Sequence, residues 1–179
     1  GASVYGHVFS GYWRYARTLD AIHATNMELL APDAPDLEAW EVRTNVRTGT
    51  PGDPSPTLFR SGAAVSRAMV GPDSVVCGTV EHSVVSAGVT IEAGAIVRDS
   101  VIMHGCRIGA GAVLDRVILD KLVSVGPGAR IGCGESVPNR AQPASLASGV
   151  TVVGKGTAIP GGIEIGRNCV VHPDLGARA

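Results

Sequence analysis

Residues 85–131 read VSAGVTIEAGAIVRDSVIMHGCRIGAGAVLDRVILDKLVSVGPGARI, and similar residues return in this stretch every 17 positions. Three columns of the repeat are aliphatic, and a fourth holds glycine followed by alanine. The columns are Val85, Ile102 and Leu119; Ile91, Ile108 and Val125; Val97, Leu114 and Ile131; and Gly94, Gly111 and Gly128. Within one period the aliphatic columns are six, six and five residues apart. This spacing indicates three short strands per turn, each with one inward aliphatic side chain.

Each coil of such a repeat leaves backbone N–H and C=O groups that only the next coil can satisfy, so the coils must stack. Small residues such as glycine fit the crowded corners. The aliphatic spacing continues outside the regular part at Val70, Val76, Val153, Ile159, Ile165 and Val171. Residues 133–149 lack it and contain two prolines, which predicts a loop that leaves the stack. The sequence therefore predicts a mostly β fold, a parallel β-helix of hexapeptide repeats over residues 67–179.

The residues before this repeat follow other patterns. Residues 4–9 alternate like a short strand, and helical spacing of apolar residues predicts a helix from its N-cap, Thr18, to Leu30. Residues 31–66 hold five prolines, with Trp40 as the main apolar anchor, and are expected to form a linker lying over a surface. One strand and one helix cannot bury a core of their own. Residues 1–30 are therefore either the C-terminal tail of a larger domain or a segment that packs onto the β-helix.

Composition excludes several classes of protein. The net charge of −1 provides no electrostatic footprint for nucleic acid or an anionic membrane. Apolar runs are shorter than the ~20 residues that cross a bilayer, and the N-terminus lacks the pattern of a secretion signal, so we expect a cytoplasmic protein. The four cysteines are Cys77, Cys106, Cys133 and Cys169. Their scattered spacing favours buried or half-buried thiols in a reducing compartment over a metal or redox site.

Two lysines and one histidine are the candidate functional residues. Lys121 follows an apolar run and Lys155 lies in the final coils, and together on one side of the prism they would hold a phosphorylated anion. His104 lies at a predicted corner, where it would be either an ordinary solvent-facing side chain or a general base. His82 and His172 have no metal-ligand spacing with His104, so no metal site is expected.

The opening residues and the repeat, taken in order, resemble the C-terminal part of the glucose-1-phosphate adenylyltransferase family, which makes ADP-glucose from ATP and glucose 1-phosphate. The matching segments are Phe9-Ser10-Gly11-Tyr12-Trp13-Arg14, Thr18-Leu19-Asp20, Asn26-Met27-Glu28-Leu29-Leu30, Trp40-Glu41-Val42-Arg43-Thr44, Val117-Ile118-Leu119-Asp120-Lys121 and Gly149-Val150-Thr151-Val152-Val153-Gly154-Lys155. The Trp-x-x-Arg-Thr linker is the more specific motif, because other sugar nucleotidyltransferases share the Tyr-Trp-Arg segment.

This resemblance implies a left-handed winding of the β-helix and a nucleotidyltransferase domain N-terminal to residue 1. It implies an assembly and regulatory role for the β-helix, within a tetramer and beside a cleft for anionic sugar-phosphate effectors. Lys121 and Lys155 match basic positions implicated in effector binding, and no catalytic residue is expected in this segment. Mg²⁺ and ATP are implied for the parent enzyme only.

One position departs from the family. The family has an aspartate that helps to hold the catalytic Mg²⁺ where this chain has Tyr15. Because Mg²⁺ prefers carboxylate oxygens, the departure suggests a catalytically weak or regulatory parent protein.

Other classes remain open from the sequence. One is another sugar-1-phosphate nucleotidyltransferase, such as a mannose-1-phosphate guanylyltransferase. A second is a stand-alone trimeric hexapeptide acyltransferase with His104 as general base, and a third is a structural solenoid without a ligand.

Overall fold

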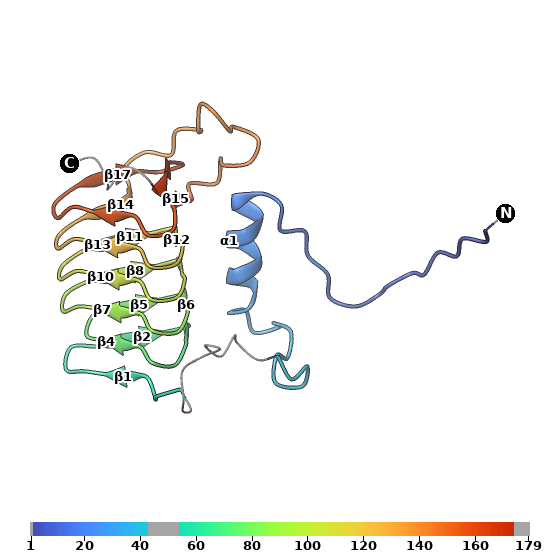
Figure 1. Ribbon diagram of the computed structural model, residues 1–179, viewed down its shortest axis with the longest axis horizontal. Helices are drawn as coiled ribbons and strands as arrows, with labels where there is room; N and C mark the ends of the chain where they lie inside the picture. The colour runs from blue at the N-terminus through green and yellow to red at the C-terminus, as the bar shows by residue number, and fades with distance from the viewer. Residues whose placement is uncertain (1, 43–53, 174–179) are drawn as a thin grey trace.

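The computed structural model describes residues 2–42 and 54–173. It contains one short helix beside a stack of coils (Figure 1). The coils form three parallel six-stranded sheets. The first sheet contains β1 (Leu58–Phe59), β4 (Val75–Val76), β7 (Thr90–Ile91), β10 (Arg107–Ile108), β13 (Ser124–Val125) and β16 (Ala158–Ile159). The second contains β2 (Ala64–Ser66), β5 (Thr79–Glu81), β8 (Ile96–Arg98), β11 (Val113–Asp115), β14 (Arg130–Cys133) and β17 (Glu164–Gly166). The third contains β3 (Met69–Val70), β6 (Val84–Val85), β9 (Val101–Ile102), β12 (Val117–Leu119), β15 (Thr151–Val153) and β18 (Val170–Val171).

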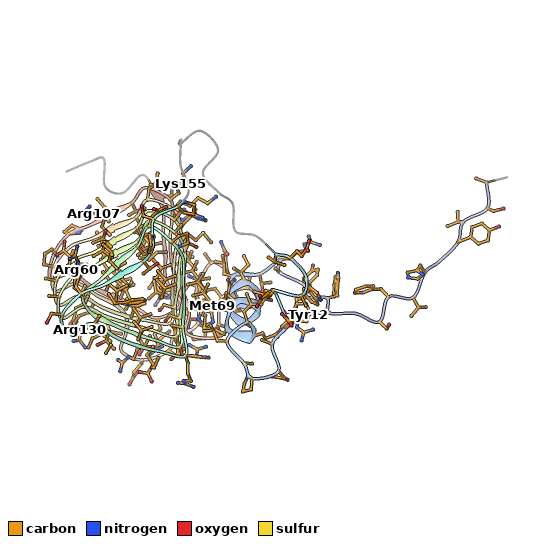
Figure 2. The ribbon with its side chains drawn as sticks, turned by 90° about the horizontal axis from the view of Figure 1, so that it is seen from below. Tyr12, Arg60, Met69, Arg107, Arg130 and Lys155 are labelled. Atoms are coloured by element: carbon orange, nitrogen blue, oxygen red, sulfur yellow. The ribbon has the colours of Figure 1, made fainter. Side chains whose placement is uncertain are left out.

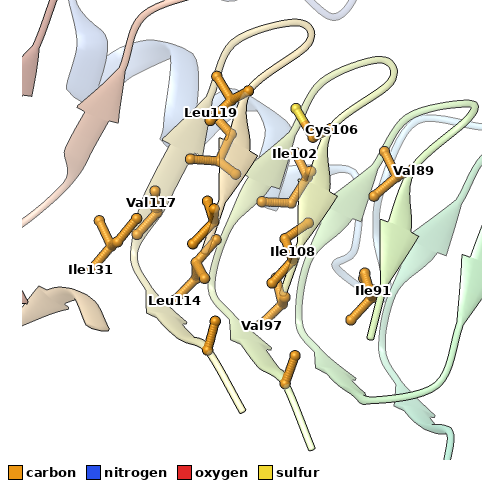
Figure 3. Close-up of a cluster of buried hydrophobic side chains, with 14 of the residues drawn as sticks. Val89, Ile91, Val97, Ile102, Cys106, Ile108, Leu114, Val117, Leu119 and Ile131 are labelled. Atoms are coloured by element: carbon orange, nitrogen blue, oxygen red, sulfur yellow. The ribbon is translucent and has the colours of Figure 1, made fainter. Parts of the chain in front are cut away.

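The aliphatic columns of the repeat form the core of the prism. Strand pairing places Leu114 between Val97 and Ile131, so residues one period apart lie one above another. The nine column residues from Val85 to Ile131 are each at most 2% exposed. Figure 3 shows side chains of this core inside the prism, among them Ile91, Leu114 and Ile131. The predicted fold class is confirmed, and the architecture is consistent with a left-handed β-helix.

The stack begins earlier than the expected residue 67. β1 and β2 already pair with β4 and β5, so the first coil starts at Leu58. Both strands are exposed along their whole length, because no coil lies beneath them in the described part of the chain. The apolar columns continue in this coil at Phe59, Val65 and Val70, but Val65 and Val70 pair with residues 15 positions later instead of 17, so the repeat is irregular here.

The long connection between β14 and β15 leaves the stack and is fastened at both ends. The Asn168 side-chain amide donates to the Val137 carbonyl oxygen and the Ser136 hydroxyl, at 2.9 and 3.1 Å. The Asn168 Oδ1 atom accepts from the backbone N–H of Gly149 at 2.7 Å. These bonds allow β15 to return directly onto β12.

The helix α1 (Leu19–Glu28) packs against the third sheet. Thr18 caps it through a hydrogen bond from the Ala21 N–H to its hydroxyl oxygen, which confirms the predicted N-cap. Its apolar side chains enter a second core beside the prism. This core contains Leu19, Ile22 and Met27 of the N-terminal segment together with Val101, Met103, Ile118, Leu146, Val150, Val152 and Val170. The structure therefore shows that this helix docks onto the β-helix, which is one of the two alternatives that the sequence left open.

Residues 4–9 do not form the expected strand. Val4 is 94% and Val8 90% exposed, and the segment runs away from the β-helix (Figure 1). A strand needs a partner for its backbone groups, and the described residues supply none here. Trp40 is half-exposed, and its ring lies 5.9 Å from that of Tyr12. Residues 43–53 of the expected linker, including Arg43 and Thr44 of the motif, lie outside the described residues, as do residues 174–179 at the end of the expected β-helix.

The buried His23 links α1 to the β-helix and makes this contact sensitive to pH. His23 is 4% exposed, and its Nε2–H donates to the backbone carbonyl of Asp99. Burial is the largest effect and lowers the pKa of His23 below 6.5. The hydrogen bond to Asp99 opposes this shift, Arg116 lowers the pKa further, and the carboxylates of Asp99 and Asp20 raise it. The His82 ring is also close, because it bonds the Asp99 side chain at 2.6 Å.

We therefore expect the docking of α1 to weaken as the pH falls below 6.5, since the undocked histidine binds a proton more tightly than the docked one. Above this pH the contribution of His23 is complete. Hydrogen exchange of the α1 amides, corrected for the intrinsic rate, should lose protection by up to about tenfold per pH unit. In His23→Gln, which keeps a donor but does not titrate, this dependence should disappear. The same pH dependence in both proteins would contradict the assignment.

Candidate functional site

One corner of the prism, between the third and the first sheet, is built from two columns of turn residues. The first column is Pro72, Ala87, His104, Lys121 and Lys155, and the second is Asp73, Gly88, Gly105, Leu122 and Gly156. Hydrogen bonds connect successive turns: the Leu122 N–H donates to the His104 carbonyl, and the Gly156 N–H to the Lys121 carbonyl, both at 2.9 Å. All five residues of the second column have positive φ, between 58° and 72°. This left-handed turn points the first-column side chains outward along one line.

A groove of about 290 Å³ follows this corner. It is lined by Asp73, Ala87, Gly88, His104, Gly105, Lys121, Leu122 and Lys155. Figure 2 looks along the stack and shows Lys155 at its corner, apart from Arg130 at another. The groove therefore draws residues from five successive coils.

Both predicted anion-binding lysines line this groove. Lys121 and Lys155 are exposed and lie in turns that stack directly on each other, so their backbones are separated by one strand spacing of about 4.8 Å. They are also the only two lysines in the sequence of 179 residues. The other residues in the Lys+Arg total are all arginines. Two flexible ammonium groups at this separation can reach the same anion.

His104 occupies the turn next to Lys121 and is half-buried in the groove wall. The ring keeps contact with solvent there, so the solvent-facing and the general-base interpretations both stay predictions. Its position beside two lysines fits an additional donor to a bound anion, and equally a base facing a ligand.

The sequence interpretation missed two groove residues, Leu122 and Asp73. Leu122 is 61% exposed, adopts φ 62°, and lies over Gly105, where an added Cβ would come within 2.8 Å of Leu122 Cδ2. Asp73 closes the opposite end, with its Oδ1 accepting from the Ser55 N–H at 2.7 Å. Both occupy a turn column that otherwise contains glycine. The presence of a larger residue in place of glycine is the feature of the sequence that could have identified them.

The other candidates of the sequence do not gather into a site. Among the described residues no group of three or more His, Cys, Asp and Glu side chains is arranged to hold a metal ion. The four thiols are free, and burial raises the pKa of Cys106 to about 11 while the other three are half-buried. His82 pairs with Asp99 on another corner. Within the described residues no helix is both long and apolar enough to span a bilayer.

Comparisons with known proteins agree with this architecture. The family described as GlmU-like, C-terminal hexapeptide matches residues 57–153. The glucose-1-phosphate adenylyltransferase of Acetivibrio thermocellus is 32% identical over 177 residues, covering 99% of this chain and 41% of that protein. Those of Thermomicrobium roseum and Thermotoga maritima are 38% and 36% identical over 97% and 94% of this chain, and 41% and 40% of theirs.

A solved structure shares the fold. The acetyltransferase domain of PglB from Neisseria gonorrhoeae, in complex with acetyl coenzyme A, superimposes with a TM-score of 0.50 at 24% identity, covering 68% of this chain and 56% of that one. The chain spans about two-fifths of the length of the three adenylyltransferases. The chain belongs to the GlmU-like C-terminal hexapeptide family, and nearly its whole length corresponds to the C-terminal region of glucose-1-phosphate adenylyltransferases.

Proposed function

We propose that the chain is the C-terminal assembly and allosteric regulatory domain of a glucose-1-phosphate adenylyltransferase, an enzyme that converts ATP and glucose 1-phosphate to ADP-glucose and diphosphate in glycogen biosynthesis. The observation that carries the regulatory part is the groove into which both lysines of the sequence project. A phosphorylated sugar is the ligand class that such paired ammonium groups suit. The similarity to the C-terminal region of these enzymes supports the rest.

An N-terminal nucleotidyltransferase domain of the same protein is the first proposed partner. The segment before α1 carries large apolar side chains in water: Val4, Tyr5, Val8, Phe9 and Trp13 are 64–94% exposed. Contiguous exposed apolar side chains of this size mark a surface that is covered in the functional protein. Because α1 is docked on the β-helix, this segment would attach the two domains at a defined position.

Assembly into a homo-oligomer, with a tetramer implied by the resemblance, is supported by the free end of the stack. Leu58, Phe59, Val65 and Met69 of the first coil are 38–56% exposed. The edges of β1, β2 and β3 lack a further strand in the described part of the chain. Exposed edges and apolar side chains together favour contact with another protein surface.

The chain does not itself supply the Mg²⁺ ligand of the family. Tyr15 is half-exposed, and its ring lies beside Trp13 and the Arg17 guanidinium. A phenol side chain next to a cation does not fit a hard divalent metal, which prefers carboxylate oxygens. This disagreement supports a parent protein that is weakly active or regulatory, and turnover at the family's level in the intact protein would contradict it.

The regulatory site is tested by isothermal titration calorimetry of the intact protein with phosphorylated sugars. We expect saturable binding that weakens roughly 5- to 10-fold in Lys121→Ala and again in Lys155→Ala, because each variant removes one charge-assisted contact. Arg107→Ala is the matched control: it removes one exposed cation from the first sheet, outside the groove. Equal losses in all three variants would indicate only a general charge effect and overturn the site.

An acyltransferase is the second candidate, because His104 lines the same groove and an acetyltransferase domain shares the fold. The same titration separates the two. Binding of acetyl coenzyme A that is lost in His104→Ala, without sugar-phosphate binding, would support the acyltransferase in place of the regulatory domain.

A further inference from the structure

The guanidinium of Arg116 has no hydrogen-bond or ion-pair partner in the part of the chain that the structure describes. Arg116 connects β11 to β12, at the corner between the second and the third sheet, and lies close enough to His23 of α1 to lower the pKa of that ring. Among the described residues, its Nε is the one buried side-chain nitrogen or oxygen without a hydrogen-bond partner. A buried cationic donor is costly to leave unpaired, so this atom indicates that something outside the described chain pairs with it.

A second arginine approaches the same place from the other side. Arg167 directly follows β17, and its side chain is only 20% exposed. Its Nε–H donates to the Gly134 carbonyl at 3.2 Å, and its Nη2 pairs with Asp115 at 3.5 Å. A Cβ atom added to Gly149 would lie 3.6 Å from both Arg116 Nε and Arg167 Nη1, with no other atom nearer. An oxygen atom near this point can therefore accept hydrogen bonds from both guanidinium groups.

The corner carries more positive than negative charge. The Asp115 carboxylate is shared between Arg98 Nη2 at 3.7 Å and Arg167 Nη2 at 3.5 Å. Two further carboxylates of this corner already have cationic partners, in the pairs Arg67–Glu81 and His82–Asp99. Three arginines, including Arg116, thus share one carboxylate. Two positive charges are left for an anion to balance.

We propose that Arg116 and Arg167 bind a tetrahedral oxyanion with two negative charges, of the phosphate or sulfate class, over the backbone of Gly149. One oxygen accepts from Arg116 Nε and another from Arg167 Nη1, and the charge of the anion balances the two arginines that lack a carboxylate. The anion joins the turn before β12 and the turn after β17 to the returning end of the segment that leaves the stack. This site lies at a different corner from the lysine groove and does not depend on the proposed regulatory function.

The first test is calorimetry of inorganic phosphate with the intact protein carrying both Lys121→Ala and Lys155→Ala, so that the lysine groove cannot contribute. We expect saturable binding that weakens at least about tenfold when either Arg116→Met or Arg167→Gln is added, because each removes a charge-assisted contact. Arg130→Met is the matched control. It removes an exposed arginine of the second sheet, outside the site, and should leave the affinity unchanged.

Thermal denaturation of the same proteins distinguishes a binding residue from a structural one. In a buffer free of phosphate and sulfate, Arg116→Met should melt at the same temperature as its parent or higher, because it removes an unpaired buried cation. Saturating phosphate should raise the melting temperature of the parent by roughly 2–5 °C and leave that of Arg116→Met unchanged. A lower melting temperature for Arg116→Met without phosphate would show that the arginine is structural and overturn the site.

Two results of the calorimetry would also overturn the proposal. The first is no saturable binding of phosphate, or an equal loss of binding in Arg130→Met, which would indicate only a general effect of charge. The second is acetate binding as tightly as phosphate, which would make the ligand a carboxylate. Acetate is planar and carries one negative charge, so the proposal expects it to bind at least about tenfold more weakly.

Discussion

Replacing Ile102 with alanine is expected to lower the free energy of unfolding by about 2–5 kcal/mol. Ile102 has no exposed surface and lies in the middle coils of the prism, where β9 pairs with β6 and β12. Each strand contributes one inward side chain to this narrow core, and the truncation of Ile102 would leave a cavity there. Neighbouring coils cannot shift to close that cavity without breaking the hydrogen bonds between their strands.

Ile163→Ala is the matched control, because it deletes the same atoms from a side chain that is 42% exposed. Its cost should stay below ~1 kcal/mol, since little apolar surface is returned to water. Chemical denaturation followed by circular dichroism measures both variants. Similar losses in the two would contradict the view that the aliphatic columns hold the coils together.

The sequence was sufficient for the fold wherever the repeat is regular. Leu114 must lie between Val97 and Ile131, because the three residues are one period apart and each strand points one of them into the core. The periodicity therefore predicted the burial, the parallel pairing and the sheet order together. It failed at the first coil, where the period shortens: Val65 pairs with Val80 and Val70 with Val85, 15 positions apart instead of 17.

The site was only partly predictable. Lys121 and Lys155 are 34 positions apart in the sequence, and the residues looped out between β14 and β15 hide that their turns are adjacent. Asp73 and Leu122 were missed because they lie in a second turn column, with Gly88, Gly105 and Gly156, that was not recognised beside the column of Gly94, Gly111 and Gly128. The docking of α1 depends on Leu146 and Val150 of the looped-out segment, which have no periodicity. Contacts of this kind follow from tertiary structure and leave no local pattern.

The second large effect is expected for Gly132→Ala, at the point where the chain leaves the stack. Gly132 has φ 77°, and a Cβ atom added there would approach the Asp115 carbonyl oxygen to an impossible 1.9 Å. The pairing of β14 with β17 shifts register between Ile131 and Cys133, so the glycine forms a bulge. The expected loss is about 3–5 kcal/mol, because backbone atoms must move in addition to the ~1–2 kcal/mol that a left-handed alanine costs.

Gly134→Ala separates the two contributions. Its φ of 74° is nearly the same, but nothing lies within 4 Å of an added Cβ atom, so it should lose only the ~1–2 kcal/mol of the backbone term. Thermal and urea denaturation compare the pair, and equal losses would show that the contact with Asp115 is not tight in solution. Because this bulge directs the loop that lets β15 stack on β12, Gly132→Ala should also separate Lys155 from Lys121 and weaken sugar-phosphate binding at temperatures where the protein is still folded. Gly134→Ala should retain that binding, since its backbone strain lies within the loop and leaves the stack of coils in register.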